Sequence, residues 1–291
     1  MGRSLLGSGS ESAHLLAAAE ARLQIPLRRL MLDGPPAELQ ATDAAQPAIL
    51  FQSLALIQLL EERGAVPAAV AGHSLGEFAG LVAAHALDPL DALEAVQARG
   101  RAMAAAAPAG SGMAAVLGLD DATVVRICGE SPDAVPANFN APGQVVISGT
   151  DHGLELVGAR LQQAGARRVI RLPVSGAFHS PLMAAAAKAF RSHWERVSLR
   201  RLDRPQVFNA DGAVHDSPAE VRDLMVAQLT GPVRWTETVK RLQGLGVDRF
   251  VEVGPGRTLA GLVRKILPGA LVHNIEDMDG IETYLRAAHA A

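Results

Sequence analysis

The stretch Val-Pro-Ala-Ala-Val-Ala-Gly-His-Ser-Leu-Gly-Glu at residues 66–77 decides the fold. A short apolar run at 68–71 meets the pattern Gly-x-Ser-x-Gly, and an apolar-periodic stretch follows from Glu77 to Leu87. Strand, sharp turn and helix in this order form a nucleophile elbow, which exposes a serine at the end of a strand. The helix behind it directs N–H groups and a partial positive charge at any oxyanion formed there. We therefore predict that Ser74 is a nucleophile, against the alternative of a glycine-rich loop with an incidental serine.

Composition excludes several classes of protein. The 291 residues are 49% hydrophobic and 20% charged, with a formal net charge of −3. This length fits one large α/β domain or two smaller ones. The charge argues against a partner made of nucleic acid, which would require concentrated Lys and Arg. The single cysteine, Cys128, excludes a disulfide framework and a cysteine-based zinc site, and we interpret it as a buried structural thiol. We expect no metal.

Two uncharged stretches, 44–60 and 102–119, resemble membrane spans in composition. Polar side chains and Pro47 interrupt the first, and Pro108 and two glycines interrupt the second, so we interpret both as buried segments of a protein with no membrane partner. The first apolar clusters of the chain are broken by polar residues, which is unlike a secretory signal. We expect a cytoplasmic protein.

Periodicity indicates strands that alternate with helices along most of the chain, which predicts a parallel sheet with ligands at the carboxyl ends of its strands. Strands are expected at 206–209 and 249–253. Helices are expected at 12–24, 48–63, 76–86, 89–106, 181–197, 217–229, 235–245 and 258–266.

The segment between the fourth and fifth of these helices has a different pattern. Strands at 111–119, 137–139, 144–148 and 167–174, with helices after the first and third, give the order β-α-β-β-α-β. This order predicts a small ferredoxin-like subdomain at 110–176. It would be inserted into a large, discontinuous α/β-hydrolase-like domain formed by 1–109 and 177–291.

A serine hydroxyl needs a base within hydrogen-bonding distance. Of nine histidines, His179 is the best candidate because it lies on a loop just past a predicted strand, before a helix that begins near Pro181. His73 adjoins the serine but would point away from it on an elbow. His273, close to Asp277, would serve instead in a conventional hydrolase triad.

Several further stretches carry a resemblance to one family. The chain resembles the malonyl-CoA:acyl-carrier-protein transacylases of fatty-acid synthesis across nearly all of residues 1–280. The similar stretches are residues 45–48, 72–77, 98–103, 138–149, 178–180, 228–229 with 232–235, and 252–256.

The resemblance implies an acyl-enzyme mechanism. Ser74 would attack the thioester of malonyl-CoA while His179 takes its proton, and the phosphopantetheine thiol of acyl carrier protein would then accept the malonyl group. Arg99 would hold the malonyl carboxylate, which a planar guanidinium can grip through two parallel hydrogen bonds. The Leu75 N–H would bind the oxyanion, and the main-chain carbonyl at Gln228 would orient His179. No cofactor is implied.

The resemblance also suggests residues with subsidiary roles. Phe178 matches the malonyl-selective form of its motif, in which a bulky ring crowds the α-carbon of the substrate. Asn138 and Asn140 match positions near the site, although asparagines that form a turn explain them equally well. Arg264 and Lys265 are candidates for contact with an acidic carrier protein, against the alternative of a solvated charged surface. We expect a monomer.

The amino terminus departs from the family pattern. Members of the family usually open with a strand that ends in Phe-Pro-Gly-Gln-Gly-Ser-Gln, and the glutamine supplies a second oxyanion N–H. Here Met1 to Leu6 resemble the residues that come after that motif. We expect that the natural start lies upstream; the alternative is a shortened member, impaired because loss of one oxyanion donor lowers turnover by about 100- to 1000-fold.

Two other functions stay open on the sequence alone. A serine hydrolase or thioesterase of the α/β-hydrolase type shares the elbow, but it expects a His-Gly-Gly-type oxyanion loop, which this sequence lacks, and it gives Arg99 no role. An impaired homologue could instead bind carrier protein without catalysis.

Overall fold

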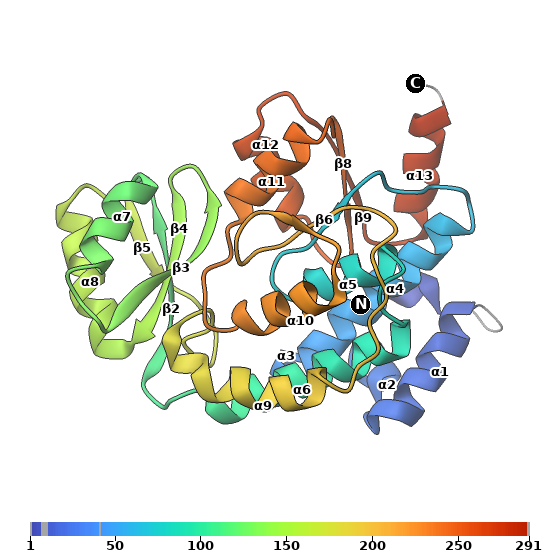
Figure 1. Ribbon diagram of the computed structural model, residues 1–291, viewed down its shortest axis with the longest axis horizontal. Coiled ribbons are helices and arrows are strands. Elements are labelled where there is room, and N and C mark those ends of the chain that lie inside the picture. Colours follow the sequence, from blue (N-terminus) through green and yellow to red (C-terminus); the bar gives the residue numbers. More distant parts are fainter. Residues whose placement is uncertain (1, 7–10, 41, 290–291) are drawn as a thin grey trace.

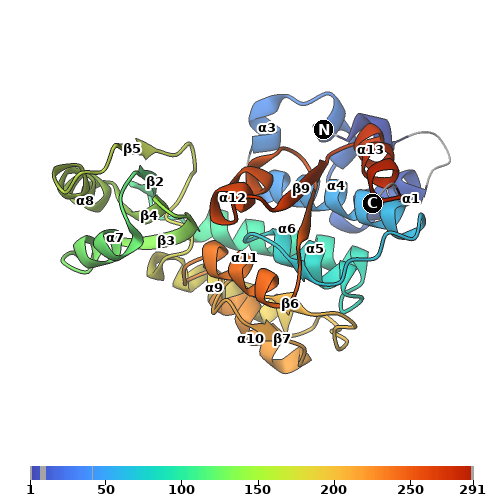
Figure 2. The same ribbon diagram turned by 90° about the horizontal axis from the view of Figure 1, so that it is seen from above.

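The computed structural model describes residues 2–6, 11–40 and 42–289, and these form a large helix-rich part and a small part beside it (Figure 1). Seen from above, the small part lies at one end of the molecule, away from both chain ends (Figure 2). The molecule as a whole has the mixed α/β architecture that the sequence predicts.

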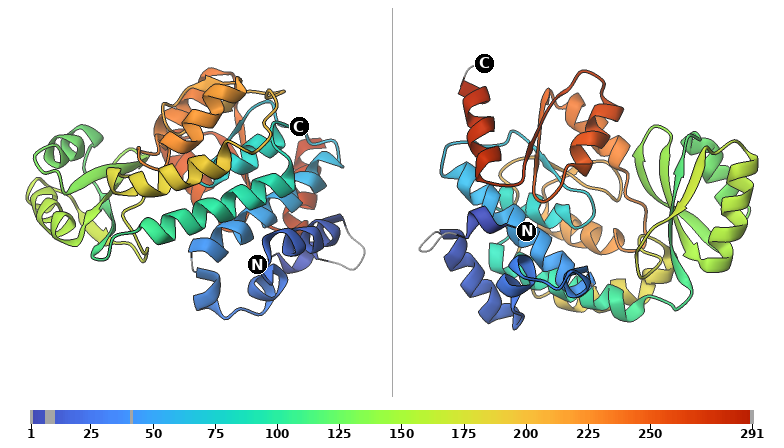
Figure 3. Two further views of the ribbon diagram at one scale, coloured as in Figure 1. Left: turned by 60° about the horizontal axis from the view of Figure 1, so that its bottom comes forward. Right: turned by 180° about the vertical axis from the view of Figure 1, so that it is seen from behind.

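Three long helices form the body of the large part. They are α4 (Thr42–Glu61), α6 (Pro89–Ala106) and α9 (Ala184–Trp194), which lie side by side with α6 in the middle (Figure 3). Helix α6 begins where the sequence predicts, because the Asp88 carboxylate accepts hydrogen bonds from the first free N–H groups and Pro89 occupies the first helical position. Arg99 is among the buried residues of this helix.

Helix α4 is buried through most of its length. Within the described part of the chain it alone is long and apolar enough to cross a membrane, yet 61% of its apolar window is buried inside the protein. Phe51, Leu54 and Leu56 lie in the main core. The helix begins at Thr42 and contains Pro47, whereas the periodicity predicts a start at 48.

The parallel strands of the large part form two separate pieces. Strand β1 (Val70–Ala71) pairs in parallel with β6 (Gln206–Val207), which also pairs with β7 (Val214–His215) in antiparallel fashion. Strands β8 (Arg249–Val253) and β9 (Leu271–Ile275) form a second parallel pair. The alternation of elements correctly predicts parallel pairing, but it does not reveal this division.

The small part has the predicted ferredoxin-like topology. Its strands β2 (Ser111–Leu117), β3 (Ala134–Ala141), β4 (Gln144–Thr150) and β5 (Arg168–Arg171) pair antiparallel in the order β3-β4-β2-β5. Helices α7 (Asp121–Cys128) and α8 (Asp151–Gln163) pack on the sheet around a separate core. Cys128 lies in that core, as predicted, and burial raises the pKa of its thiol to about 12.

The remaining elements cover the large part. Helices α1 (Glu11–Leu23), α5 (Gly76–Ala83), α10 (Pro218–Ala227), α11 (Trp235–Gly244) and α12 (Thr258–Ile266) lie close to their predicted positions. Short 3-10 helices span Arg3–Leu5 and Pro181–Met183. Elements that the sequence analysis did not predict are α2 (Leu27–Leu32), α3 (Pro36–Gln40), β7, β9 and α13 (Met278–His289).

Candidate active site

Ser74 lies on a sharp turn between β1 and α5, as the elbow pattern predicts. Its φ of 51° is in the left-handed region, which is uncommon for a residue with a side chain and marks local strain. The turn is tight enough that a Cβ on Gly72 would lie 1.9 Å from the carbonyl carbon of Gly76, so position 72 requires glycine. Gly76 itself has open space where a Cβ would lie.

His179 is hydrogen-bonded to the serine. Its Nε2 lies 2.8 Å from Ser74 Oγ, and its Nδ1 lies 2.8 Å from the main-chain oxygen of Gln228. Because a carbonyl oxygen only accepts, Nδ1 carries the proton and Nε2 is left to accept from the serine hydroxyl. His179 also has a positive φ, 57°, and the next residue, Ser180, closes this turn by donating to the Ala177 carbonyl.

Arg99 reaches the same serine from α6. The side chain is 1% exposed, and its Nη2 lies 2.8 Å from Ser74 Oγ and 2.9 Å from Gln228 Oε1. Its Nη1 donates to Gln46 Oε1 at 2.7 Å. The buried Nε finds no acceptor among the residues that the structure describes. A buried guanidinium beside a nucleophile, with one donor unused, is suited to a substrate that carries an anionic group.

Two amide side chains hold the elbow in place. Asn209, just past β6, accepts from the Ser74 N–H at 2.6 Å and donates to the Gly72 carbonyl at 2.8 Å. Gln228 donates through Nε2 to the Ser74 carbonyl at 3.0 Å. The N–H of Leu75, next to the nucleophile at the start of α5, has no hydrogen-bond partner within the described chain. It is therefore available to an oxyanion.

Comparison with known proteins identifies the family of the chain. Residues 1–284 match the acyl transferase domain family. The chain belongs to this family.

The acyltransferase is similar to curated and solved proteins over nearly its full length. It is 38% identical to the malonyl CoA-acyl carrier protein transacylase of Bacillus subtilis (strain 168) over 287 residues, which cover 97% of this chain and 90% of the relative. The acyl-carrier-protein S-malonyltransferase of Burkholderia pseudomallei 1710b has a TM-score of 0.92 at 39% identity, with 97% and 95% of the two chains covered.

A third similar protein is the malonyl-transacylase solved in complex with its type II polyketide synthase acyl-carrier protein. Its TM-score is 0.94 at 36% identity, with coverage of 98% of this chain and 94% of that one.

The other predicted residues of the acyltransferase lie at varying distances from the serine. Phe178 packs between the core of the large part and a small cluster that includes Met113 and Val146. Asn140 Oδ1 accepts a hydrogen bond from His73 Nε2 at 2.9 Å, which agrees with a structural role for that histidine. The buried Asn138 Oδ1 has no hydrogen-bond partner in the described residues.

The two basic residues of α12 and the alternative histidine lie elsewhere. Arg264 donates to the Val272 carbonyl and Lys265 to Gln144 Oε1, each at 2.8 Å, and both side chains are exposed. Lys265 thereby bridges α12 and the start of β4 in the small part. His273 packs edge-to-face on Tyr284, and it is His179 that pairs with Ser74.

Three buried residues of the site were not singled out from the sequence: Gln46, Glu77 and Asn209. Each had a signal. Gln46 lies in one of the stretches that carry the family resemblance, Glu77 follows the elbow pattern directly, and Asn209 ends a predicted strand at the edge where α/β sites gather.

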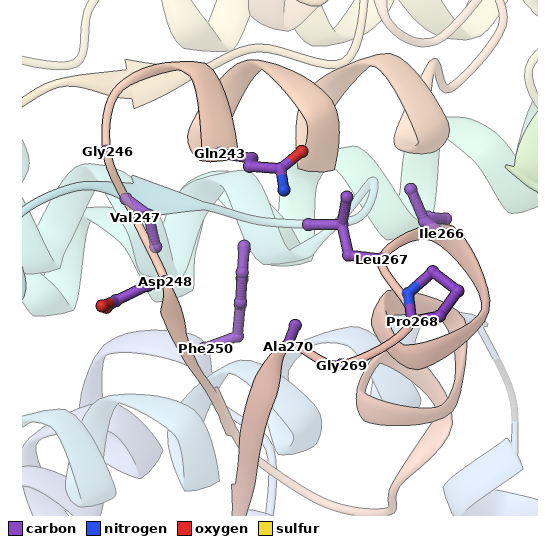
Figure 4. Close-up of a pocket in the computed structure, with 10 residues that line it drawn as sticks. All are labelled: Gln243, Gly246, Val247, Asp248, Phe250, Ile266, Leu267, Pro268, Gly269 and Ala270. Atoms are coloured by element: carbon purple, nitrogen blue, oxygen red, sulfur yellow. The ribbon is translucent and has the colours of Figure 1, made fainter.

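A cavity of about 590 Å³ lies elsewhere, at the amino-terminal ends of β8 and β9 (Figure 4). Its lining is mixed, with Phe250, Ile266 and Leu267 beside Gln243 and Asp248, and none of the residues around Ser74 contributes to it. Because α/β sites form at the carboxyl ends of the strands, this cavity lies at the opposite end from the expected site.

The environment of His179 predicts an unusual pH dependence. Burial and the positive charge of Arg99 lower the pKa of His179 from its ordinary value of 6.5 to about 3. A base works in its neutral form, so a lowered pKa keeps His179 active at more acidic pH. We expect kcat/KM for acylation to stay nearly constant between pH 7 and about 5, where an ordinary histidine would be protonated. Rate loss centred near pH 6.5 in protein that remains folded by circular dichroism would contradict this.

Proposed function

We propose that this acyltransferase transfers the malonyl group from malonyl-CoA to the phosphopantetheine thiol of acyl carrier protein through a malonyl-Ser74 ester. The observation that carries the proposal is the convergence on Ser74 Oγ of a neutral base, His179 Nε2, and a buried guanidinium, Arg99. A hydrolase of simple esters needs the base but has no use for the guanidinium. The names of similar proteins point to the same reaction.

In the first half-reaction His179 Nε2 takes the hydroxyl proton as Ser74 Oγ attacks the thioester carbonyl. The carbonyl oxygen becomes an oxyanion beside the Leu75 N–H, where the start of α5 adds a partial positive charge. The C–S bond then breaks, and the departing CoA sulfur takes the proton from His179. The Gln228 main-chain carbonyl, which accepts from Nδ1, stabilises the imidazolium that exists between these two proton transfers.

The second half-reaction is the reverse with a different thiol. The carrier's phosphopantetheine thiol gives its proton to His179 and attacks the ester, and Ser74 leaves with that proton restored. Each step as written moves only a proton and the malonyl group, so the proposal includes no cofactor.

Recognition of the acyl group is assigned to Arg99 and Phe178. Arg99 would turn its Nη2, now on Ser74 Oγ, and its unused Nε toward the malonyl carboxylate. Phe178 would crowd a branched α-carbon, although one methyl group is worth only about 1–3 kcal/mol of discrimination. Asn138 and Asn140 would line the side of the site that the small part forms.

Carrier protein would dock near the exposed Arg264 and Lys265, whose positive charges suit an acidic partner. Lys265 lies where the large and small parts meet, because it contacts Gln144. We propose that the protein acts as a monomer in the cytoplasm.

Incubation with malonyl-CoA in the absence of carrier protein should give a covalent malonyl adduct on Ser74, which mass spectrometry of the intact protein and of its peptides can locate. Addition of the carrier should then move the malonyl group to the carrier thiol. Ser74→Ala, which removes only the nucleophilic oxygen, is the matched control and should carry no adduct.

Other outcomes of the same experiment favour the alternatives. Release of free malonate without transfer to carrier would indicate a thioesterase. A folded protein that binds carrier but gives no adduct would indicate a binding homologue.

A further inference from the structure

Glu77 is a buried carboxyl group for which the proposed mechanism has no task. It lies in the first turn of α5, and the residue is 1% exposed. Acidic residues in a first helical turn are favourable through the helix dipole, but they usually remain in solvent. A fully buried glutamate so close to a nucleophile needs a specific set of partners.

Those partners connect Glu77 to Ser74, Arg99 and His179. Its Oε1 accepts from the main-chain N–H of Asn209, whose side chain holds the Ser74 N–H. Its Oε2 accepts from Nε2 of Gln228. The same Gln228 accepts from Arg99 through Oε1 and from His179 through its main-chain oxygen.

The Gln228 amide can therefore take only one of its two orientations. Its oxygen faces a donor, Arg99 Nη2, and its NH2 group faces two acceptors, Glu77 Oε2 and the Ser74 carbonyl. A flip by 180° would place the NH2 group against the guanidinium and the oxygen against two other oxygens. The contacts with Arg99 and the Ser74 carbonyl oppose such a flip by themselves, and an acceptor at position 77 adds to that opposition.

The hydrogen-bond donors around Glu77 favour its ionised form, whereas burial favours its neutral form. Burial has the larger effect, so the pKa of Glu77 is raised to about 8 although the Asn209 and Gln228 N–H donors and the positive charge of Arg99 lower it. Because each carboxyl oxygen faces an N–H donor, a protonated carboxyl would bring an O–H against one of them.

We propose that Glu77 is a positioning residue, which fixes the orientation of the Gln228 amide by accepting from its Nε2 and thereby anchors Arg99 for the substrate carboxylate. The inference rests on the proposed function, because it concerns the choice of a carboxylated acyl group. It assigns to Glu77 no contact with substrate.

Glu77→Gln tests this with almost no change of volume. The new side chain must turn its oxygen to the fixed Asn209 N–H, so its NH2 group faces Gln228 Nε2. The Gln228 amide then flips or loses the partner that helps to hold it, so its hydrogen bond to Arg99 is lost or weakened, while the contact of Arg99 with Gln46 remains. Loss of one hydrogen bond to a charged group changes a rate by about tenfold or more. We therefore expect the rate of malonyl loading on Ser74 to fall at least about tenfold further than the rate of acetyl loading.

The ratio of malonyl to acetyl loading is the decisive readout, since a purely structural role would lower both rates alike. Glu155→Gln is the matched control: Glu155 is exposed on α8, and its substitution should leave the ratio unchanged. Gln228→Met removes the amide but keeps the main-chain carbonyl that binds His179, so it should reproduce the loss in ratio. In a double-mutant cycle, Glu77→Gln should add little to Gln228→Met.

The results separate this inference from the proposed function. If wild-type protein gives no malonyl adduct, the proposed function fails. If wild-type protein loads malonyl and folded Glu77→Gln keeps its ratio, or if the two substitutions add independently, the positioning role is wrong. If Glu77→Gln does not fold, Gln228→Met decides: an unchanged ratio contradicts the inference, and a lowered ratio supports it.

Discussion

His179→Ala is expected to lower the rate of Ser74 acylation by about 10²- to 10⁴-fold, the usual contribution of a positioned general base. Without the imidazole, the serine hydroxyl has no acceptor for its proton and keeps only the hydrogen bond from Arg99. Rapid-quench mass spectrometry of the malonyl adduct measures this rate without interference from the second half-reaction.

His273→Ala is the control for that experiment. His273 is an alternative base by sequence, but it lies on β9 against Tyr284. Its substitution should leave the acylation rate within about twofold of the wild-type rate, a difference of less than about 0.5 kcal/mol in the barrier. If His273→Ala abolished acylation and His179→Ala did not, the hydrolase interpretation would replace that of an acyltransferase.

Arg99→Ala should have the second-largest effect, and one that depends on substrate. Loss of charge-assisted hydrogen bonds to a carboxylate should lower kcat/KM for malonyl-CoA by about 100-fold or more. Acetyl-CoA offers no carboxylate, so its loading should fall only through the lost contact between Arg99 and Ser74 Oγ. Parallel measurement of the two acylation rates gives the comparison.

Arg99→Lys sharpens that comparison. A lysine keeps the positive charge but cannot reproduce the planar pair of donors, so the malonyl preference should recover only in part. If Arg99→Ala lowered the rates of malonyl and acetyl loading equally, Arg99 would have no role in recognition of the carboxylate.

Local signals in the sequence predicted much of the fold. Asp88 and Pro89 mark the start of α6, and the β-α-β-β-α-β order gives the topology of the small part. Strand β9 and helix α13 were missed, although α13 is amphipathic. The division of the parallel strands depends on which strands become neighbours, and periodicity carries no information on pairing partners.

The residues of the site likewise fall into those that the sequence predicted and those that it did not. Ser74 and His179 were predicted from their local motifs and places in the chain, whereas Arg99 was predicted from the family resemblance alone. Asn209 and Glu77 were not, because their roles arise only when α5 and the segment after β6 come together in the folded chain. An asparagine at the end of a strand has many ordinary explanations, and only its contact with the Ser74 N–H distinguishes this one.

The small part enters the chain between two residues that act on the same oxygen. Helix α6, which carries Arg99, leads into β2, and β5 leads out toward His179. Nucleophile, base and guanidinium all belong to the large part, whereas β3 of the small part reaches the elbow through the contact of Asn140 with His73. The small part is thus a separate module inserted into the chain between Arg99 and His179. Insertions or exchanges within β2–β5 can therefore alter the surface beside the elbow while Ser74, His179 and Arg99 keep their places.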